Sequence, residues 1–186
     1  MITKDQLRKK FLNLRKKKYY EVSSVKFNQL INYIKKKYKF KKKIFIALYY
    51  PSNFEINIFQ TLNNFKSSKS VLLLPKIQDG NSLEFIEWNT RDVLLVNKFG
   101  IPEPIKKQKS HLPDIVLVPL LAFDNNKNRL GYGKGFYDRY FNNLKKQNKK
   151  IEAIGVAFSF QNCKKIPVSK FDFQLSNIFT EKGFSK

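Results

Sequence analysis

Cysteine, histidine and acidic residues are scarce in this sequence. Its 186 residues include one cysteine, Cys163, one histidine, His111, and 14 aspartates and glutamates. A lone cysteine excludes an internal disulfide and agrees with a reducing compartment. With one cysteine and one histidine the chain has no Cys/His zinc pattern, and a single loop histidine with no partner in sight gives no Ser-His-Asp set. We expect His111, in a polar loop before Pro113, to face solvent.

Long apolar runs are missing as well. No stretch approaches the roughly 20 apolar residues that a membrane-spanning helix needs, so we expect no membrane partner. The segment from Met1 to Lys18 lacks the apolar core of a secretory signal, and we therefore expect a cytoplasmic protein. Hydrophobic residues still make up 42% of the chain, which predicts one globular domain over residues 1–186.

The shortage of acids leaves a formal charge of +23. Most of the excess is lysine in short runs, at residues 16–18, 35–37 and 41–43. Such a field attracts polyanions, so a basic nucleic-acid-binding module without enzymatic activity is one interpretation. Because arginine is uncommon and no RNA-binding signature is present, we favour a solvated lysine surface and expect no specific nucleic-acid partner.

The most informative stretch runs from Arg129 to Tyr140, with the sequence RLGYGKGFYDRY. It follows an apolar run at 114–121, which predicts a buried strand, and it opens a predicted amphipathic helix. Three alternating glycines let a ligand approach bare backbone, and a helix N-terminus favours phosphate. The spacing matches neither the Walker loop nor the dinucleotide fingerprint. By glycine spacing alone, a phosphate site and a plain strand-to-helix turn are both open.

Two charged residues in this stretch favour the phosphate interpretation. Lys134 adds a positive charge inside the turn, and Asp138 at the start of the helix could hold a cation. The first prediction is therefore a nucleotide phosphate bound together with Mg²⁺.

The N-terminal segment predicts a helix. Thr3 and Gln6 have the spacing of a capping box, and Leu7, Phe11 and Leu14 then repeat at helical spacing. Lys4 and Arg8 share a face away from this apolar stripe, which by itself suits a solvent-exposed basic face.

Strands and helices alternate through the rest of the chain. Apolar runs at 43–50, 70–75, 83–88, 152–158 and 177–181 predict strands, and Glu55 begins a predicted helix that carries Ile56, Phe59 and Leu62. This order predicts an α/β fold, a three-layer α/β/α sandwich with a mostly parallel, Rossmann-like sheet. A ligand is then expected at the carboxyl ends of the strands, near residues 50–55, 119–124 and the glycine stretch.

The segments 114–124 and 128–140 together resemble the signature of the 5-formyltetrahydrofolate cyclo-ligase (methenyltetrahydrofolate synthetase) family. Further matches occur in the right order at Lys4-x-x-Leu7-Arg8, Glu55-Ile56, 99–104 and 154–161, so the resemblance covers essentially the whole chain. It implies ATP- and Mg²⁺-dependent conversion of 5-formyltetrahydrofolate, free or polyglutamylated, to 5,10-methenyltetrahydrofolate. We expect a monomer.

The resemblance also implies roles for individual residues. Lys134 and Arg129 would be catalytic, and Asp138 would hold Mg²⁺. Folate would be contacted by Tyr50, Glu55, Phe136 and Tyr137. ATP would be contacted by Lys4, Asp5, Gln6, Leu7, Arg8, Arg129, Leu130, Gly131, Tyr132, Gly133, Lys134, Gly135, Phe136 and Tyr137.

One position departs from the family pattern. Some members carry an acidic residue near the C-terminus that is thought to help hold Mg²⁺, and here Ser176 takes that place. A hydroxyl is a weaker magnesium ligand than a carboxylate. Water, Asp172 four residues earlier, or the phosphates of ATP could fill the missing contact.

Overall fold

A seven-stranded sheet forms the centre of the protein. The computed structural model describes residues 2–61, 65, 69–78, 82–105 and 109–185. The strand order is β11-β10-β9-β6-β1-β2-β3. The strands are β1 (Ile44–Ala47), β2 (Ser70–Ile77), β3 (Leu83–Glu87), β6 (Ile115–Pro119), β9 (Glu152–Val156), β10 (Asn177–Thr180) and β11 (Gly183–Phe184).

The sheet is parallel in its middle and antiparallel at both edges. Strands β10, β9, β6, β1 and β2 pair in parallel, whereas β3 and β11 each run antiparallel to their single neighbour. Two small hairpins lie outside the sheet, one of β4 (Leu94–Val96) and β5 (Pro102–Pro104), the other of β7 (Ala122–Phe123) and β8 (Arg129–Leu130). The predicted mostly parallel sheet is confirmed.

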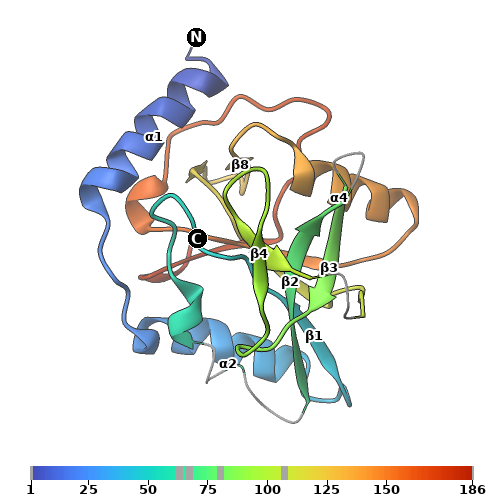
Figure 1. Cartoon of the computed structure of the whole chain (residues 1–186). Coiled ribbons are helices and arrows are strands. Elements are labelled where there is room, and N and C mark those ends of the chain that lie inside the picture. The colour runs from blue at the N-terminus through green and yellow to red at the C-terminus, as the bar shows by residue number, and fades with distance from the viewer. Residues whose placement is uncertain (1, 62–64, 66–68, 79–81, 106–108, 186) are drawn as a thin grey trace.

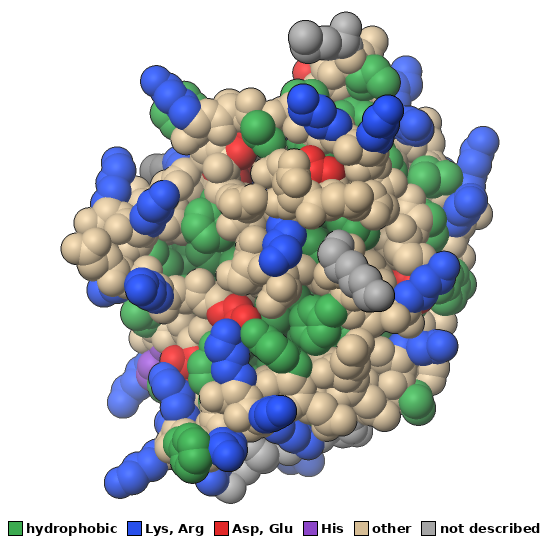
Figure 2. All heavy atoms as spheres, turned by 180° about the vertical axis from the view of Figure 1, so that it is seen from behind, with side chains coloured by type: hydrophobic (Ala, Val, Ile, Leu, Met, Phe, Trp, Pro, Cys, Tyr) green, Lys and Arg blue, Asp and Glu red, His purple; other side chains and the backbone are tan. Residues whose placement is uncertain are grey.

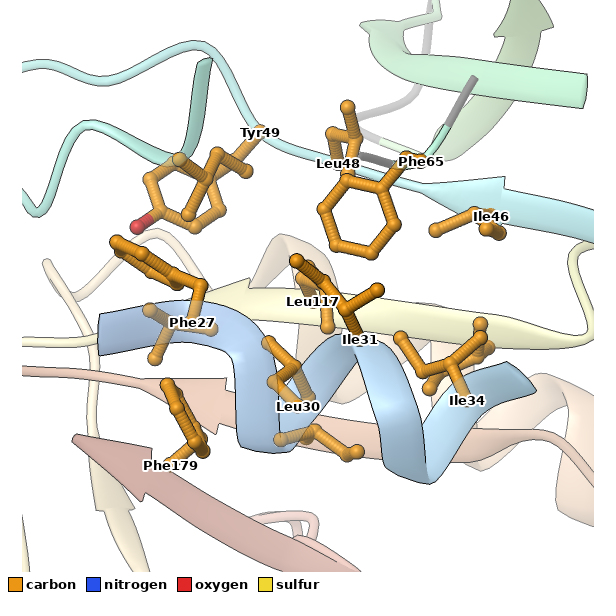
Figure 3. Close-up of a cluster of buried hydrophobic side chains, with 14 of the residues drawn as sticks. Phe27, Leu30, Ile31, Ile34, Ile46, Leu48, Tyr49, Phe65, Leu117 and Phe179 are labelled. Atoms are coloured by element: carbon orange, nitrogen blue, oxygen red, sulfur yellow. The ribbon is translucent and has the colours of Figure 1, made fainter. Parts of the chain in front are cut away.

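Helix α2 (Asn28–Lys37), preceded by the 3-10 turn η1 (Ser24–Phe27), covers one face of the sheet. Figure 3 shows Leu30, Ile31 and Ile34 of this helix pointing toward Ile46 and Leu117 of the sheet. Side chains at even positions of β1 belong to this core, because successive residues of a strand point to opposite faces.

Helix α4 (Phe136–Lys146) covers the other face. Its Phe141 and Leu144 pack with Ala47 and Val116, which are the strand neighbours of Ile46 and Leu117. The three-layer α/β/α arrangement is therefore confirmed. Figure 1 shows α1 (Lys4–Lys18) at the outer edge of the molecule, apart from these two helices. Among the described residues, no helix is long and apolar enough to cross a bilayer.

Helix α1 begins as predicted, with both hydrogen bonds of the Thr3–Gln6 capping box present. Its buried face differs from the prediction, since the buried residues are Leu7, Phe11 and Arg15. Leu14 is only partly buried, against the small core shared with the β7–β8 hairpin. Spacing of four residues after Phe11 leads to Arg15, so an arginine takes the place expected for an apolar side chain.

Three other local predictions need correction. The β7–β8 hairpin separates the buried strand β6 from the glycine stretch, so the glycines do not follow that strand directly. The helix expected from Glu55 is the 3-10 turn η2 (Ile58–Thr61), and Leu62 lies outside the described residues. His111 does not simply face solvent, because its Nε2 lies 3.1 Å from Glu87 Oε2 and its ring stacks on Phe45.

Candidate functional site

A cavity of about 490 Å³ opens at the carboxyl ends of the central strands. This position is the one expected for a ligand of an open α/β sheet. The wall combines the ends of β1 and β6, the glycine stretch, the start of α1 and the β4–β5 hairpin. The lining includes Lys4, Arg8, Tyr50, Glu55, Phe99, Asp172 and all ten residues from Arg129 to Asp138.

The glycine loop, residues 131–135, forms one wall of the cavity. Gly133 and Gly135 have φ values of +96° and +66°, a region that disfavours side chains. Gly131 lacks a positive φ, but a Cβ there would lie 3.0 Å from the Arg129 guanidinium. Arg8 and Arg139 approach Gly133 and Gly135 in the same way. Each glycine thus leaves room for an arginine beside bare backbone.

Arg129 and Lys134, the two predicted catalytic cations, differ in their surroundings. The Arg129 side chain is 5% exposed, and its Nη2 lies 2.9 Å from Asp138 Oδ1. No hydrogen-bond partner for its Nε is found among the described residues. Lys134 is exposed, and its Nζ lies 5.6 Å from the centre of the Phe99 ring. A buried, oriented guanidinium and a movable ammonium therefore border one cavity.

Two further cations reach the cavity from α1. Arg8 Nε donates to the carbonyl of Gly131 at 3.0 Å, and its guanidinium pairs with Asp5. Lys4 Nζ lies 2.5 Å from Asp172 Oδ2, which also accepts the backbone N–H of Ser169. Partial burial raises the pKa of Asp172, but the Lys4 and Ser169 bonds outweigh it, so the pKa lies below its usual value.

Glu55 is the buried acid of the site. One carboxylate oxygen accepts the Tyr132 hydroxyl at 2.5 Å, and the other accepts the backbone N–H of Ser52 at 2.8 Å. Burial raises the pKa of Glu55, and the positive charge of Arg15 opposes the rise. A carboxylate has about four acceptor positions, so Glu55 retains capacity for a ligand's N–H groups.

Aromatic rings make up much of the remaining wall. Tyr50 stands edge-on to Phe59, while Phe136 stands edge-on to Phe99. Phe99 lies in the β4–β5 hairpin, which the sequence suggested only as a rigid connection. Its contacts with Phe136 and Lys134 place this hairpin across the glycine loop. The family match at residues 99–104 is the sequence signal that could have placed this hairpin at the cavity.

Some predicted residues lie away from the cavity wall. Asp5 and Gln6 are exposed on the first turn of α1, where they bond Arg8 and Thr3. Leu7 is buried in the core beneath that helix. Direct ATP contacts by these three residues therefore stay predictions. Trp88 is a core residue that stacks on Phe59.

Two carboxylates on the cavity wall, Asp138 and Asp172, have the oxygen chemistry that magnesium prefers. The described residues contain no group of three His, Cys, Asp or Glu side chains placed to hold a metal. Magnesium often takes only one or two protein carboxylates and completes its shell with phosphates and water. Asp138 and Asp172 both line the cavity. Ser176 does not, since it is exposed and its Oγ accepts the N–H of Ala153.

Comparison with known proteins identifies the family. A sequence profile described as the 5-formyltetrahydrofolate cyclo-ligase family matches residues 1–181. The chain belongs to this family. The 5-formyltetrahydrofolate cyclo-ligase of Haemophilus influenzae is 33% identical over 139 residues, which cover 72% of this chain and 73% of that protein.

Solved structures of cyclo-ligase relatives share the fold. The 5,10-methenyltetrahydrofolate synthetase of Aquifex aeolicus superposes with a TM-score of 0.76 at 32% identity, over 98% of this chain and 92% of that one. The synthetase of Mycoplasma pneumoniae gives a TM-score of 0.72 at 27% identity, over 95% and 98% of the two chains. As a cyclo-ligase family member, the protein is a ligase of folate one-carbon metabolism.

Proposed function

We propose that this protein converts 5-formyltetrahydrofolate to 5,10-methenyltetrahydrofolate, with conversion of ATP to ADP and phosphate. The supporting observation is that one cavity joins the glycine loop and Lys134 to the buried carboxylate of Glu55. A phosphate-binding surface and an acceptor for a pterin thus face a common space. Membership of the cyclo-ligase family gives this pairing its chemical meaning.

The nucleotide phosphates would lie along the glycine loop. Backbone N–H groups of a loop that leads into a helix N-terminus favour anions. Lys134 and Arg129 border the same space, and Lys4 and Arg8 close it from α1. Because Lys4 is paired with Asp172 and Arg8 with Asp5, binding would exchange these carboxylates for phosphate oxygens.

The folate would lie on the side of Glu55. The pterin ring carries N–H donors, and the free acceptor positions of the Glu55 carboxylate are suited to bind them. Tyr50, Phe136 and Tyr137 would frame the ring, which favours aromatic neighbours. In this arrangement the formyl group points toward the glycine loop.

The reaction needs positioning more than acid–base catalysis. The formyl oxygen attacks the γ-phosphorus, and the bond from that phosphorus to the bridging oxygen of ADP breaks. N10 then attacks the activated formyl carbon and loses its proton, and the C–O bond breaks to release phosphate. Cations neutralise the charge of the transferred group, and alignment of two substrates supplies most of the remaining catalysis.

Asp138 and Asp172 would hold Mg²⁺ together with phosphate oxygens and water. When bound, it neutralises phosphate charge and helps orient the triphosphate. For Asp138 this requires sharing its carboxylate with Arg129, which lies 2.9 Å away.

The test is a direct assay of the full chain. With ATP, Mg²⁺ and 5-formyltetrahydrofolate together, we expect absorbance of the methenyl product to rise in proportion to the phosphate released. Omission of any one component should stop both signals. A folded, magnesium-supplied protein that yields neither signal contradicts the proposed function.

A further inference from the structure

Arg15 is an arginine in the wrong place for a solvent-facing charge. It lies on the lysine-rich helix α1, yet its side chain is 0% exposed and it does not line the cavity. Neighbouring Lys16 is exposed, as its sequence suggests. Burial of a guanidinium is costly unless its charge and N–H groups have partners. The contacts of Arg15 therefore indicate the role of this side chain.

Those contacts form a chain that ends at the cavity. Arg15 Nη1 donates to the carbonyl of Leu120 at 3.1 Å, which fixes the guanidinium. Its Nη2 donates to the hydroxyl of Tyr132, and its charge lies 5.6 Å from the centre of the Tyr132 ring. The Tyr132 hydroxyl in turn donates to Glu55 Oε1 at 2.5 Å. With the Ser52 N–H on Oε2, both carboxylate oxygens are held.

The charge of Arg15 matches the need of Glu55. Among the described residues, the titratable groups around this carboxylate are Tyr49, two residues after β1, Tyr132 from the glycine loop, Tyr137 from α4 and Arg15 from α1. The first three carry a proton at neutral pH, since burial raises the pKa of each above its ordinary value. Arg15 is thus the only cation in this set.

We propose that Arg15 is a positioning residue that acts through the Tyr132 hydroxyl to hold the Glu55 carboxylate in place for the pterin. This inference rests on the proposed function, because it takes Glu55 as the folate contact. Arg15 itself touches neither substrate.

Three variants test the proposal. Tyr132→Phe removes only the bridging hydroxyl, Arg15→Met removes the charge at similar volume, and Lys16→Met removes one charge from the exposed face of the same helix. For Tyr132→Phe and Arg15→Met we expect the KM for 5-formyltetrahydrofolate to rise about tenfold, the size expected for one charged hydrogen bond. The KM for ATP should stay within about twofold, and Lys16→Met should match the unmodified chain.

The pH dependence gives a readout that a purely structural role would not change. Both Arg15 and the Tyr132 hydroxyl hold the pKa of Glu55 down against the effect of burial. Either variant should therefore let the carboxylate take up a proton at higher pH. As pH is lowered, the rise in the folate KM should therefore begin at a higher pH in the variants than in the unmodified chain.

The outcomes separate this inference from the function on which it rests. An inactive unmodified chain contradicts the proposed function. Suppose instead that the unmodified chain is active and that Tyr132→Phe is folded by its melting curve. If this variant leaves the folate KM unchanged, or raises both KM values equally, the role of Arg15 is contradicted while the proposed function stands. Because Tyr132→Phe removes a single oxygen, it decides the question even if Arg15→Met does not fold. Effects of Arg15→Met and Tyr132→Phe that simply add in the double variant also contradict it.

Discussion

The positive charges of this protein fall into two groups that differ in their surroundings. Arg8, Arg129 and Lys4 line the cavity, Arg15 is connected to it through Tyr132, and each of the four bonds a particular oxygen of the protein. In the lysine runs at 16–18, 35–37 and 41–43, every side chain is exposed, including those of Lys37 and Lys41, which pair with Glu152 and Asp114. Figure 2 shows Lys and Arg spread over the face it displays, without gathering into one patch.

This contrast shows that the positions of individual charges indicate function in this protein, whereas the net charge does not. The net charge of +23 invites a nucleic-acid interpretation, yet scattered exposed lysines give only weak, salt-dependent attraction. Lys4, Arg8 and Arg129, each fixed by a bond to an oxygen of the protein, line one cavity. They can stabilise charge much more strongly there, because solvent screens them less.

The largest effect is expected from Lys134→Met. Loss of the ammonium that we propose binds phosphate should lower kcat/KM by at least about 100-fold, with little change in melting temperature because the side chain is exposed. Lys98→Met is the matched control, since Lys98 lies 5.5 Å from the same Phe99 ring but does not line the cavity. Equal losses in the two variants would remove the distinction between cavity and surface lysines.

A smaller effect on activity is expected from Gly133→Ala. The φ of +96° costs an alanine about 1–2 kcal/mol, and the new Cβ would lie 3.2 Å from Arg8 Cζ. Gly100→Ala has a similar backbone cost, at φ +75°, but meets no atom within 4 Å. Urea unfolding should show comparable destabilisation, while steady-state assays show a rise in the KM for ATP only in Gly133→Ala. A rise in both would show that strain, and not contact with Arg8, matters.

The Lys4–Asp172 ion pair on the cavity wall should contribute modestly to stability. The pKa of Asp172 is lowered in the folded protein. Asp172 therefore stabilises the fold fully at pH values above its pKa in the unfolded chain, and this stabilisation is lost as pH falls through its pKa in the folded protein. Asp172→Asn should therefore reduce the free energy of unfolding by at most about 1 kcal/mol at neutral pH. The difference from the unmodified chain should vanish in acid. A difference that grows as pH falls would contradict this role.

The smallest effect is expected from the double variant Lys16→Gln, Lys17→Gln. Both side chains are exposed, so turnover and melting temperature should stay close to those of the unmodified chain. Retention on heparin should decrease slightly and disappear for both proteins at high salt. A marked loss of salt-resistant RNA binding would instead favour a specific polyanion surface.

The sequence predicts the sheet and the glycine loop well, because apolar runs and positive-φ glycines are local signals. It fails for Arg15, since an arginine in a lysine-rich helix is expected to face solvent, and only its spacing of four from Phe11 hints at burial. The Tyr132–Glu55 bond joins positions 77 residues apart, and the Lys4–Asp172 pair joins both ends of the chain. Contacts of this kind depend on the tertiary fold and leave no local pattern.

The most direct test of the central claim is a crystal structure of the protein with ADP, Mg²⁺ and 5-formyltetrahydrofolate. The account predicts the terminal phosphate against the backbone amides of residues 131–135 and Lys134, with the pterin bonded to Glu55. It is contradicted if the nucleotide binds away from the glycine loop, or if Glu55 bonds only Tyr132 and Ser52 while the pterin lies elsewhere.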